Sequence, residues 1–297
     1  MNSIAIIGPT ASGKSALAHQ IAKENKSVIL SLDSLALYKE IDILSAKPSK
    51  QELQEVPYFG VDIIKPNQHF NAAKFASLYK EAYEEATKRS TPLIIVGGSS
   101  FYLKSLIEGF SNEPDISSNT IKTVNELLKD QKSAYKRLLA VDPHYASTLN
   151  SSDTYRIEKA LLLFYQTQQA PSEYWKEHPK KSELLAAVDI YEVDIPREAL
   201  RKRVARRTQL MFEQGAIDEV LALEKRYTRT PKSMQSIGIL EILSYLDGKI
   251  DLAQCKELIS IHTAQLAKRQ STFNRHQFKE VLLAPSEQLY TLIQERS

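Results

Sequence analysis

Cysteine is nearly absent from this sequence, which has one, Cys255, among 297 residues. One cysteine cannot form an intramolecular disulfide, and no Cys/His cluster offers the paired ligands of a zinc site. Long apolar runs are missing too: runs such as residues 93–96 and 160–164 are far shorter than the roughly 18 residues that a spanning helix needs. The first residues enter an apolar run at 3–7 without the basic flank of a signal peptide. We therefore expect a cytoplasmic protein that does not cross a membrane.

A strong charge of one sign is also absent. The net charge is 39 − 36 = +3, which is too small to indicate a polyanionic partner by itself. Apolar residues make up 42% of the chain and charged residues 25%, which excludes a disordered, collagen-like or coiled-coil protein. The length suits two domains of about 150 residues each or one α/β unit with an insertion. No extended apolar stripe calls for a dimer, so we expect a monomer.

Short, uniformly apolar runs predict the strands of the N-terminal part. Between the first two runs, the spacing of Leu17, Ala18 and Ile21 indicates a helix over residues 16–23. Strands that are apolar throughout are typical of a parallel sheet that helices cover on both faces. The four predicted strands lie at residues 3–7, 28–33, 61–64 and 92–96.

The strand pattern disappears after about residue 112, and helical spacing replaces it. A strand pattern returns at residues 188–193, and a helical stripe follows at 200–221. We therefore predict an α/β fold with a phosphate-loop parallel sheet core flanked by helices. The core would be built from residues 1–112 and 188–297, and an all-helical insertion domain, residues 113–187, would interrupt it.

Residues 8–15 match the phosphate-loop pattern of two glycines five apart, followed by Lys and a hydroxyl residue. The motif lies between a predicted strand and a predicted helix, as a phosphate loop must. Its backbone N–H groups and the helix N-terminus attract phosphate oxygens, Lys14 adds a point charge, and Ser15 offers a hydroxyl ligand for Mg²⁺. The predicted diphosphate- or triphosphate-binding loop consists of Gly8, Pro9, Thr10, Ala11, Ser12, Gly13, Lys14 and Ser15.

Asp33 ends the second predicted strand, at the edge of the sheet where the phosphate loop also lies. From this position it can act as a general base, reach the metal shell, or cap a helix. A phosphate-loop kinase usually has an Asp at the end of another strand to hold its metal. Here the strand over residues 92–96 runs into Gly97-Gly98-Ser99-Ser100 instead. The two glycines suit either a close approach of the backbone to a ligand or a tight turn.

Two clusters of basic residues occur in the C-terminal part. Arg203 and Arg207 are four residues apart on a predicted helix, so they share a face, and a phosphate between them would relieve their repulsion. A solvated basic face is the alternative. Lys268 and Arg269, close to Phe273, suit either nucleic-acid contact with base stacking or a solvated helix end.

Taken in order, these motifs resemble the tRNA dimethylallyltransferase family, also called the tRNA isopentenyltransferases. The resemblance extends along essentially the whole chain. In addition to the phosphate loop, it rests on five segments: Asp33-Ser34 with Tyr38, Asp42 and Ala46-Lys47-Pro48; Val96-Gly97-Gly98-Ser99 with Tyr102; Arg203, Arg207, Met211 and Gly215; residues 233–238; and residues 267–270.

The resemblance implies transfer of a dimethylallyl group from dimethylallyl diphosphate to N6 of the adenine immediately 3′ of a tRNA anticodon, with Mg²⁺ and release of diphosphate. The phosphate loop would bind the prenyl diphosphate in place of ATP, with Arg203 and Arg207 facing the diphosphate and Ser15 reaching Mg²⁺. Asp33, Ser99 and Lys14 would be the catalytic residues, with Asp33 as the base and Ser99 beside the adenine.

The resemblance also implies how tRNA binds. The helical insertion would clasp the anticodon stem, and the adenine would flip out of its loop into a channel. Ala36 stands where the family usually has a glutamine that helps to bind tRNA. The expected tRNA-binding residues are Asp33, Ser34, Leu35, Ala36, Ser99, Lys122, Lys268 and Arg269.

Two other functions account for part of these observations. A small-molecule phosphate-loop kinase would use residues 8–15 and Asp33, but it would leave the insertion and the later basic motifs unexplained. A non-catalytic RNA-binding protein would use the basic helices and leave Lys14, Ser15 and Asp33 without a role.

Overall fold

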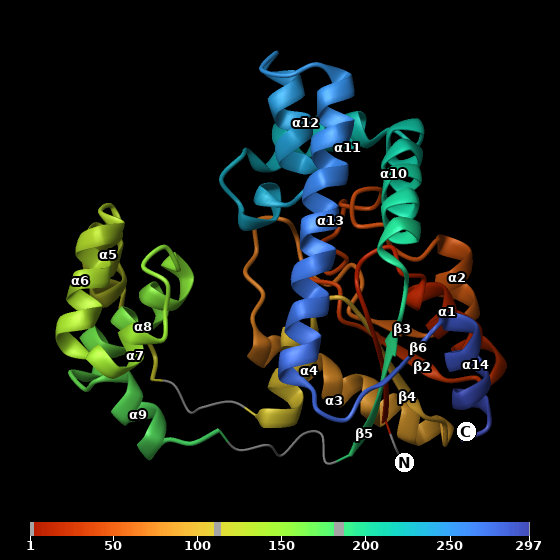
Figure 1. Ribbon diagram of the computed structural model, residues 1–297, viewed down its shortest axis with the longest axis horizontal. Coiled ribbons are helices and arrows are strands. Elements are labelled where there is room, and N and C mark those ends of the chain that lie inside the picture. The colour runs from red at the N-terminus through yellow and green to blue at the C-terminus, as the bar shows by residue number, and fades with distance from the viewer. Residues whose placement is uncertain (1–2, 110–113, 181–186, 297) are drawn as a thin grey trace. The chain divides into compact units, whose positions relative to one another are not determined.

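The computed structural model describes residues 3–109, 114–180 and 187–296 (Figure 1). The chain forms two compact units. Unit 1 consists of Met1–Ile107 and Leu184–Ser297, and unit 2 is Glu108–Glu183. The first domain boundary that the sequence predicts, between residues 112 and 113, lies outside the described residues.

Unit 1 contains a parallel sheet of six strands in the order β3-β2-β4-β1-β5-β6. The fold class is therefore the one that the sequence predicts. The runs at 3–7, 92–96 and 188–193 all form strands. The first and second are buried at every strand position, as suits strands covered on both faces, whereas the third carries Asp189 and Glu192 and is only partly buried. The strands are β1 (Ser3–Ile7), β2 (Val28–Ser31), β3 (Tyr58–Phe59), β4 (Leu93–Gly97), β5 (Val188–Val193) and β6 (Leu282–Ala284).

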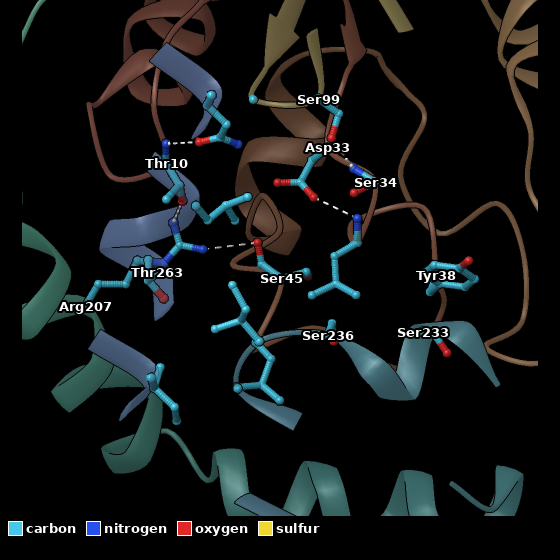
Figure 2. Close-up of a pocket in the computed structure, with 18 of the residues that line it drawn as sticks. Thr10, Asp33, Ser34, Tyr38, Ser45, Ser99, Arg207, Ser233, Ser236 and Thr263 are labelled. Carbon is cyan, nitrogen blue, oxygen red and sulfur yellow. Dashed lines mark hydrogen bonds between the residues drawn. The ribbon is translucent and has the colours of Figure 1, made fainter. Parts of the chain in front are cut away.

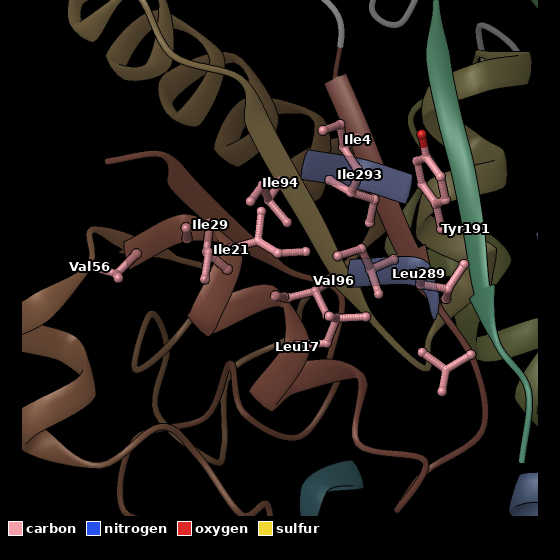
Figure 3. Close-up of a cluster of buried hydrophobic side chains, with 14 of the residues drawn as sticks. Ile4, Leu17, Ile21, Ile29, Val56, Ile94, Val96, Tyr191, Leu289 and Ile293 are labelled. Atoms are coloured by element: carbon pink, nitrogen blue, oxygen red, sulfur yellow. The ribbon is translucent and has the colours of Figure 1, made fainter. Parts of the chain in front are cut away.

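Helices cover both faces of this sheet. Helix α1 (Lys14–Glu24) and helix α14 (Ser286–Gln294) enclose a core that includes Ile4, Ile21 and Leu289 (Figure 3). Because side chains alternate along a strand, β2 and β4 direct their other side chains to the opposite face, where α3 (Ala72–Arg89) packs. Helices α2 (Lys50–Glu55) and α4 (Ser100–Glu108) complete the first half of unit 1.

Two of the predicted strands need correction. The run at 61–64 is not a strand: β3 lies earlier, at Tyr58–Phe59, and Ile64 makes only an isolated bridge with Tyr38. The chain turns instead, because Gly60 and Asp62 have φ values of 81° and 56°. Strand β2 ends at Ser31, two residues before Asp33, which begins a turn.

The C-terminal half of unit 1 is mostly helical. The helical stripe predicted over residues 200–221 is divided into two helices at Gly215, where φ is 96°. These helices and those that follow enclose a second core, which includes Met211, Ile242 and Ile259. The elements are α10 (Arg197–Glu213), α11 (Ala216–Tyr227), the 3₁₀ helix η1 (Lys232–Gln235), α12 (Ile239–Leu246) and α13 (Leu252–Gln277).

Every regular element described in unit 2 is a helix, and these helices have a hydrophobic core of their own. Trp175 packs against that core, with its ring centroid 4.8 Å from that of Tyr145. The helices are α5 (Ser118–Leu128), α6 (Gln131–Val141), α7 (Pro143–Ser147), α8 (Thr154–Thr167) and α9 (Pro171–Glu177). Among the described residues of both units, none of the helices is both long enough and apolar enough to cross a membrane.

Candidate active site

The phosphate-loop motif connects β1 to α1, as the sequence predicts. Gly8 and Gly13 have φ values of 147° and 99°, which side chains with a Cβ rarely adopt, so the tight path of the loop depends on glycine at both positions. The amino group of Lys14 is buried and donates a hydrogen bond to the carbonyl oxygen of Pro9 at 3.0 Å. The Lys14 side chain therefore folds back over the phosphate loop, where a bound phosphate would also lie.

Burial has a large effect on Lys14. Loss of hydration lowers the pKa of its amino group to about 8, while the nearby carboxylate of Asp33 partly opposes this shift. The guanidinium of Arg207 lowers the same pKa further. Burial also lowers the pKa of Arg207, and Asp33 again opposes the change. Two cations and one carboxylate are therefore close enough to influence one another, and an anionic ligand would stabilise both cations.

Arg203 and Arg207 both reach the phosphate loop from α10. Arg203 donates a hydrogen bond to the carbonyl oxygen of Ser12 at 2.7 Å. Arg207 donates to the hydroxyl of Thr10 at 3.3 Å and to the carbonyl oxygen of Ser45 at 3.4 Å (Figure 2). The sequence left two possibilities for these arginines, phosphate binding or a solvated basic face. In the structure, both arginines contact the phosphate loop.

Asp33 lies in the turn that follows β2, and it does not cap a helix. Its Oδ1 accepts hydrogen bonds from the backbone N–H groups of Leu35 at 2.8 Å and Ala36 at 3.2 Å. The described residues donate no hydrogen bond to Oδ2. One oxygen thus holds the carboxylate in place, and the other is available to accept a proton.

The end of β4 lies against the end of β2. Leu32 donates its N–H to the carbonyl of Val96 at 2.7 Å, and Ser99 donates its N–H to the carbonyl of Leu32 at 3.2 Å. A Cβ atom at Gly97 would lie 2.7 Å from the Cβ of Leu32, so only glycine permits this approach. Gly97 therefore allows the ends of β2 and β4 to approach each other. This approach places Ser99 beside the turn that carries Asp33.

Two cavities adjoin these groups. One, of about 530 Å³, extends from the phosphate loop past Asp33 and Ser99 toward α13 (Figure 2). The other, of about 360 Å³, is lined by Gly13, Ser15 and Arg203. Five residues line both cavities: Thr10, Lys14, Asp33, Ser45 and Arg207. Part of the predicted diphosphate-binding set, including Thr10, Lys14 and Arg207, therefore borders the same cavities as the predicted base, Asp33.

Ser45 was not among the predicted site residues, although Asp42 and Ala46-Lys47-Pro48 on either side of it belong to the motifs of the resemblance. In the loop that carries Ser45, the backbone N–H groups of Asp42, Ile43 and Leu44 all donate to the carboxylate of Glu219 on α11, at 2.8 to 3.1 Å. Glu219 thereby fixes the loop whose Ser45 carbonyl holds Arg207. No local pattern could reveal this contact, because about 175 residues separate its two sides.

Three of the predicted tRNA-binding residues, Lys122, Lys268 and Arg269, do not line these two cavities. Lys268 and Arg269 are exposed on α13 and line a shallow cavity with Phe273, whose ring is 6.5 Å from that of Phe278. Lys122 is exposed on α5 and belongs to unit 2.

Comparisons with known proteins show the family of this chain. The sequence model of the IPP transferase family matches residues 36–277. The chain is 48% identical to the tRNA dimethylallyltransferase of a Sulfurovum species, an alignment that covers 94% of this chain and 93% of the relative. The chain belongs to the IPP transferase family.

Other relatives of the family support this assignment. The tRNA dimethylallyltransferase of Sulfurimonas denitrificans is 48% identical over 99% of this chain and 98% of its own length. A crystal structure of the tRNA isopentenylpyrophosphate transferase of Staphylococcus epidermidis matches with a TM-score of 0.69 and 27% identity, and each chain is covered completely. A eukaryotic dimethylallyltransferase described as acting on tRNA matches with a TM-score of 0.83 and 25% identity over 96% of this chain and 74% of its own.

Proposed function

We propose that this protein is a tRNA-modifying prenyltransferase. It transfers the dimethylallyl group of dimethylallyl diphosphate to N6 of the adenine immediately 3′ of the tRNA anticodon and releases diphosphate. Membership of the IPP transferase family supports the reaction class, since the relatives bear the name tRNA dimethylallyltransferase.

One observation carries the proposal for the site. Thr10, Lys14 and Arg207, which suit a diphosphate, line the same two cavities as Asp33, which suits an amine. A donor whose diphosphate lies on the phosphate loop would place its first prenyl carbon next to Asp33. An adenine that enters the larger cavity would then present its amino group between Asp33 and Ser99.

The chemistry follows from these positions. The bond between N6 and the first prenyl carbon forms while the bond from that carbon to the diphosphate oxygen breaks. The proton on N6 passes to Oδ2 of Asp33, and the negative charge of the leaving diphosphate increases. Lys14, Arg203, Arg207 and the N–H groups of the loop stabilise that charge where it develops.

The donor set suits Mg²⁺ only in the presence of the diphosphate. The described residues contain no group of three or more His, Cys, Asp or Glu side chains that could hold a metal. Ser15 is exposed and lines the smaller cavity together with Asp33, and Mg²⁺ in nucleotide sites keeps several waters and binds through few protein ligands together with substrate phosphates. Ser15 would supply the hydroxyl ligand, and Mg²⁺ would neutralise part of the diphosphate charge.

The tRNA contacts are part of the same proposal. Lys268 and Arg269 would contact the phosphate backbone of the anticodon stem-loop, and Lys122 of unit 2 would contribute a further cation. Ser34 and Leu35 would contact the loop around the flipped adenine, whereas Ala36 is only 3% exposed, so its side chain is not available to tRNA. We expect the protein to act as a cytoplasmic monomer.

Incubation of the purified protein with unmodified tRNA, Mg²⁺ and either dimethylallyl diphosphate or ATP tests the proposal. We expect prenylated adenosine with the prenyl donor and no phosphate transfer with ATP. Phosphate transfer from ATP, without any prenylated nucleoside, would instead establish a phosphate-loop kinase.

A further inference from the structure

The side-chain amide of Gln270 joins two parts of the site that are far apart in the sequence. Its Oε1 accepts a hydrogen bond from the backbone N–H of Thr10 at 2.8 Å (Figure 2). The rest of the amide lies directly against Gly98: a Cβ atom added there would overlap Nε2 and would lie 3.1 Å from Cδ. Gln270 therefore separates the phosphate loop from the loop that carries Ser99.

The orientation of this amide is determined by its partner. The N–H of Thr10 can only donate, so the oxygen of the amide must face Thr10 and the nitrogen must face Gly98. Nε2 makes no hydrogen bond with the described residues, and Gln270 lines the larger cavity. The amide thus spans the gap between the two loops without being held by other side chains there.

The helix that carries Gln270 is well anchored. Ala267 and Asn274, one turn before and after it, are buried, and Asn274 donates a hydrogen bond to Glu192 of β5 at 2.8 Å. Helix α13 also packs against α10, which supplies Arg203 and Arg207. A side chain on so fixed a helix can transmit its position to both loops.

We propose that Gln270 is a positioning residue that sets the separation between the phosphate loop and the Gly97–Ser99 segment. This inference rests on the prenyl transfer proposed above. The phosphate loop holds the leaving diphosphate and Ser99 lies beside the acceptor base, so the distance between the two loops determines the alignment of N6 with the first prenyl carbon. An error of about 1 Å in such an alignment costs about 10²-fold in rate. Gln270 acts through Thr10 and Gly98 and need not touch the reacting atoms.

A double-mutant cycle tests this role. Gln270→Ala is expected to lower kcat by about 10²-fold while the KM for tRNA changes less than about twofold, because alignment and not tRNA binding is lost. Gly98→Ala is expected to lower kcat similarly, because the new Cβ displaces the amide. Gly98 does not have a positive φ, so alanine is compatible with its backbone. In the Gln270→Ala background, Gly98→Ala should add no further loss, because the group that it displaces is gone.

Two controls separate positioning from folding. Gln265→Ala removes an exposed glutamine from the same helix, in the shallow cavity beside Lys268; any effect should fall on tRNA affinity, and kcat at saturating tRNA should stay unchanged. Hydrogen exchange at the Thr10 amide of the ligand-free protein should become faster in Gln270→Ala, while the thermal unfolding midpoint stays close to that of the wild type. Gln270→Asn, which is too short to reach both loops, should not rescue kcat.

The possible results distinguish failure of the positioning role of Gln270 from failure of the proposed function. If the wild-type protein makes no prenylated tRNA, the proposed function fails. If the wild type is active and Gln270→Ala retains its kcat, only the positioning role is overturned. Additive losses in the double mutant, or a change confined to the KM for the prenyl donor, would also overturn it.

Discussion

The side-chain hydroxyl of Ser99 accepts a hydrogen bond from the backbone N–H of Ser34 at 3.3 Å. This contact joins the end of β4 to the turn after β2, which carries Asp33. Together with the backbone hydrogen bonds of Leu32, it keeps Asp33, the proposed base, close to Ser99, which lies beside the proposed adenine site. Ser99 therefore has a structural task in the free protein that is separate from any contact with the substrate.

Replacement of Asp33 by asparagine should separate its structural role in the turn from its proposed role as the base. The side-chain oxygen of the asparagine can still accept the N–H groups of Leu35 and Ala36, so the turn is retained, but the amide cannot accept the proton from N6. We expect kcat to fall by about 10²- to 10⁴-fold with little change in tRNA affinity. Single-turnover transfer and tRNA binding, compared with Asp62→Asn, would measure this. Unchanged turnover in Asp33→Asn would remove this residue from the base role.

The pKa of Lys14 predicts how capture of the donor depends on pH. Burial lowers this pKa to about 8, so the free protein loses the ammonium charge as the pH rises through about 8. The value of kcat/KM for the prenyl donor, which reports the free enzyme, should therefore decline above that pH. Bound diphosphate stabilises the ammonium and raises its pKa, so kcat should hold to a higher pH.

The same shift has a consequence for stability. Folding favours the neutral form of Lys14, so the free energy of unfolding should increase between pH 8 and the ordinary pKa of 10.5.

Profiles of kcat/KM for the prenyl donor, measured between pH 7 and 10 for the wild type and Lys14→Met, test whether Lys14 causes the decline in donor capture. A wild-type profile that stays level, or an identical decline in Lys14→Met, would contradict it.

Arg203 and Arg207, which contact the phosphate loop, should contribute to donor binding, whereas their neighbour Arg206, which lines neither cavity, should not. A charge-assisted hydrogen bond contributes about 1.5–3 kcal/mol, or about 10- to 150-fold in affinity. We expect Arg203→Ala and Arg207→Ala to raise the KM for the prenyl donor within this range, and Arg206→Ala to change it less than about twofold. Equal effects of all three substitutions would indicate a general effect of the basic helix on association.

The parts of the fold that were predictable are those that depend on neighbours in the sequence. Apolar runs identified β1 and β4, the β-branched and aromatic residues of 188–193 identified β5, and the spacing of the glycines, Lys14 and Ser15 identified the phosphate loop. Strand β6 was missed because a run of three residues, Leu282–Ala284, carries no periodic signal and owes its state to pairing with β5. The strand predicted at 61–64 was wrong because the left-handed backbone at Gly60 and Asp62 is not visible in an apolar pattern.

The same distinction holds for the site. The resemblance to a family was enough to indicate Asp33, Ser99, Arg203 and Arg207, because each belongs to a short motif of the sequence. The contacts that hold them, such as Glu219 with the loop at 42–44, join segments that no local pattern relates. Their prediction requires the folded chain, because they follow from tertiary packing alone.

Lys268 and Arg269 should bind tRNA through its phosphates. Both are exposed beside Phe273, and each phosphate contact that is lost should reduce the salt dependence of binding by about one unit in the slope of log K against log salt concentration. We expect Lys268→Ala with Arg269→Ala to weaken tRNA binding without a change in kcat at saturating tRNA. Lys225→Ala on α11 serves as the matched loss of an exposed cation. An unaltered slope in the double variant would exclude these two residues from the interface.

The central claim concerns both the group transferred and the base that receives it. Its most direct test is to treat unmodified tRNA with the protein, dimethylallyl diphosphate and Mg²⁺, digest the RNA to oligonucleotides, and locate the modification by mass spectrometry. The account predicts one dimethylallyl group, on the adenine immediately 3′ of the anticodon, and no product when that adenine is replaced by guanine. A prenyl group on another nucleotide, or none on any tRNA tested, would contradict the account.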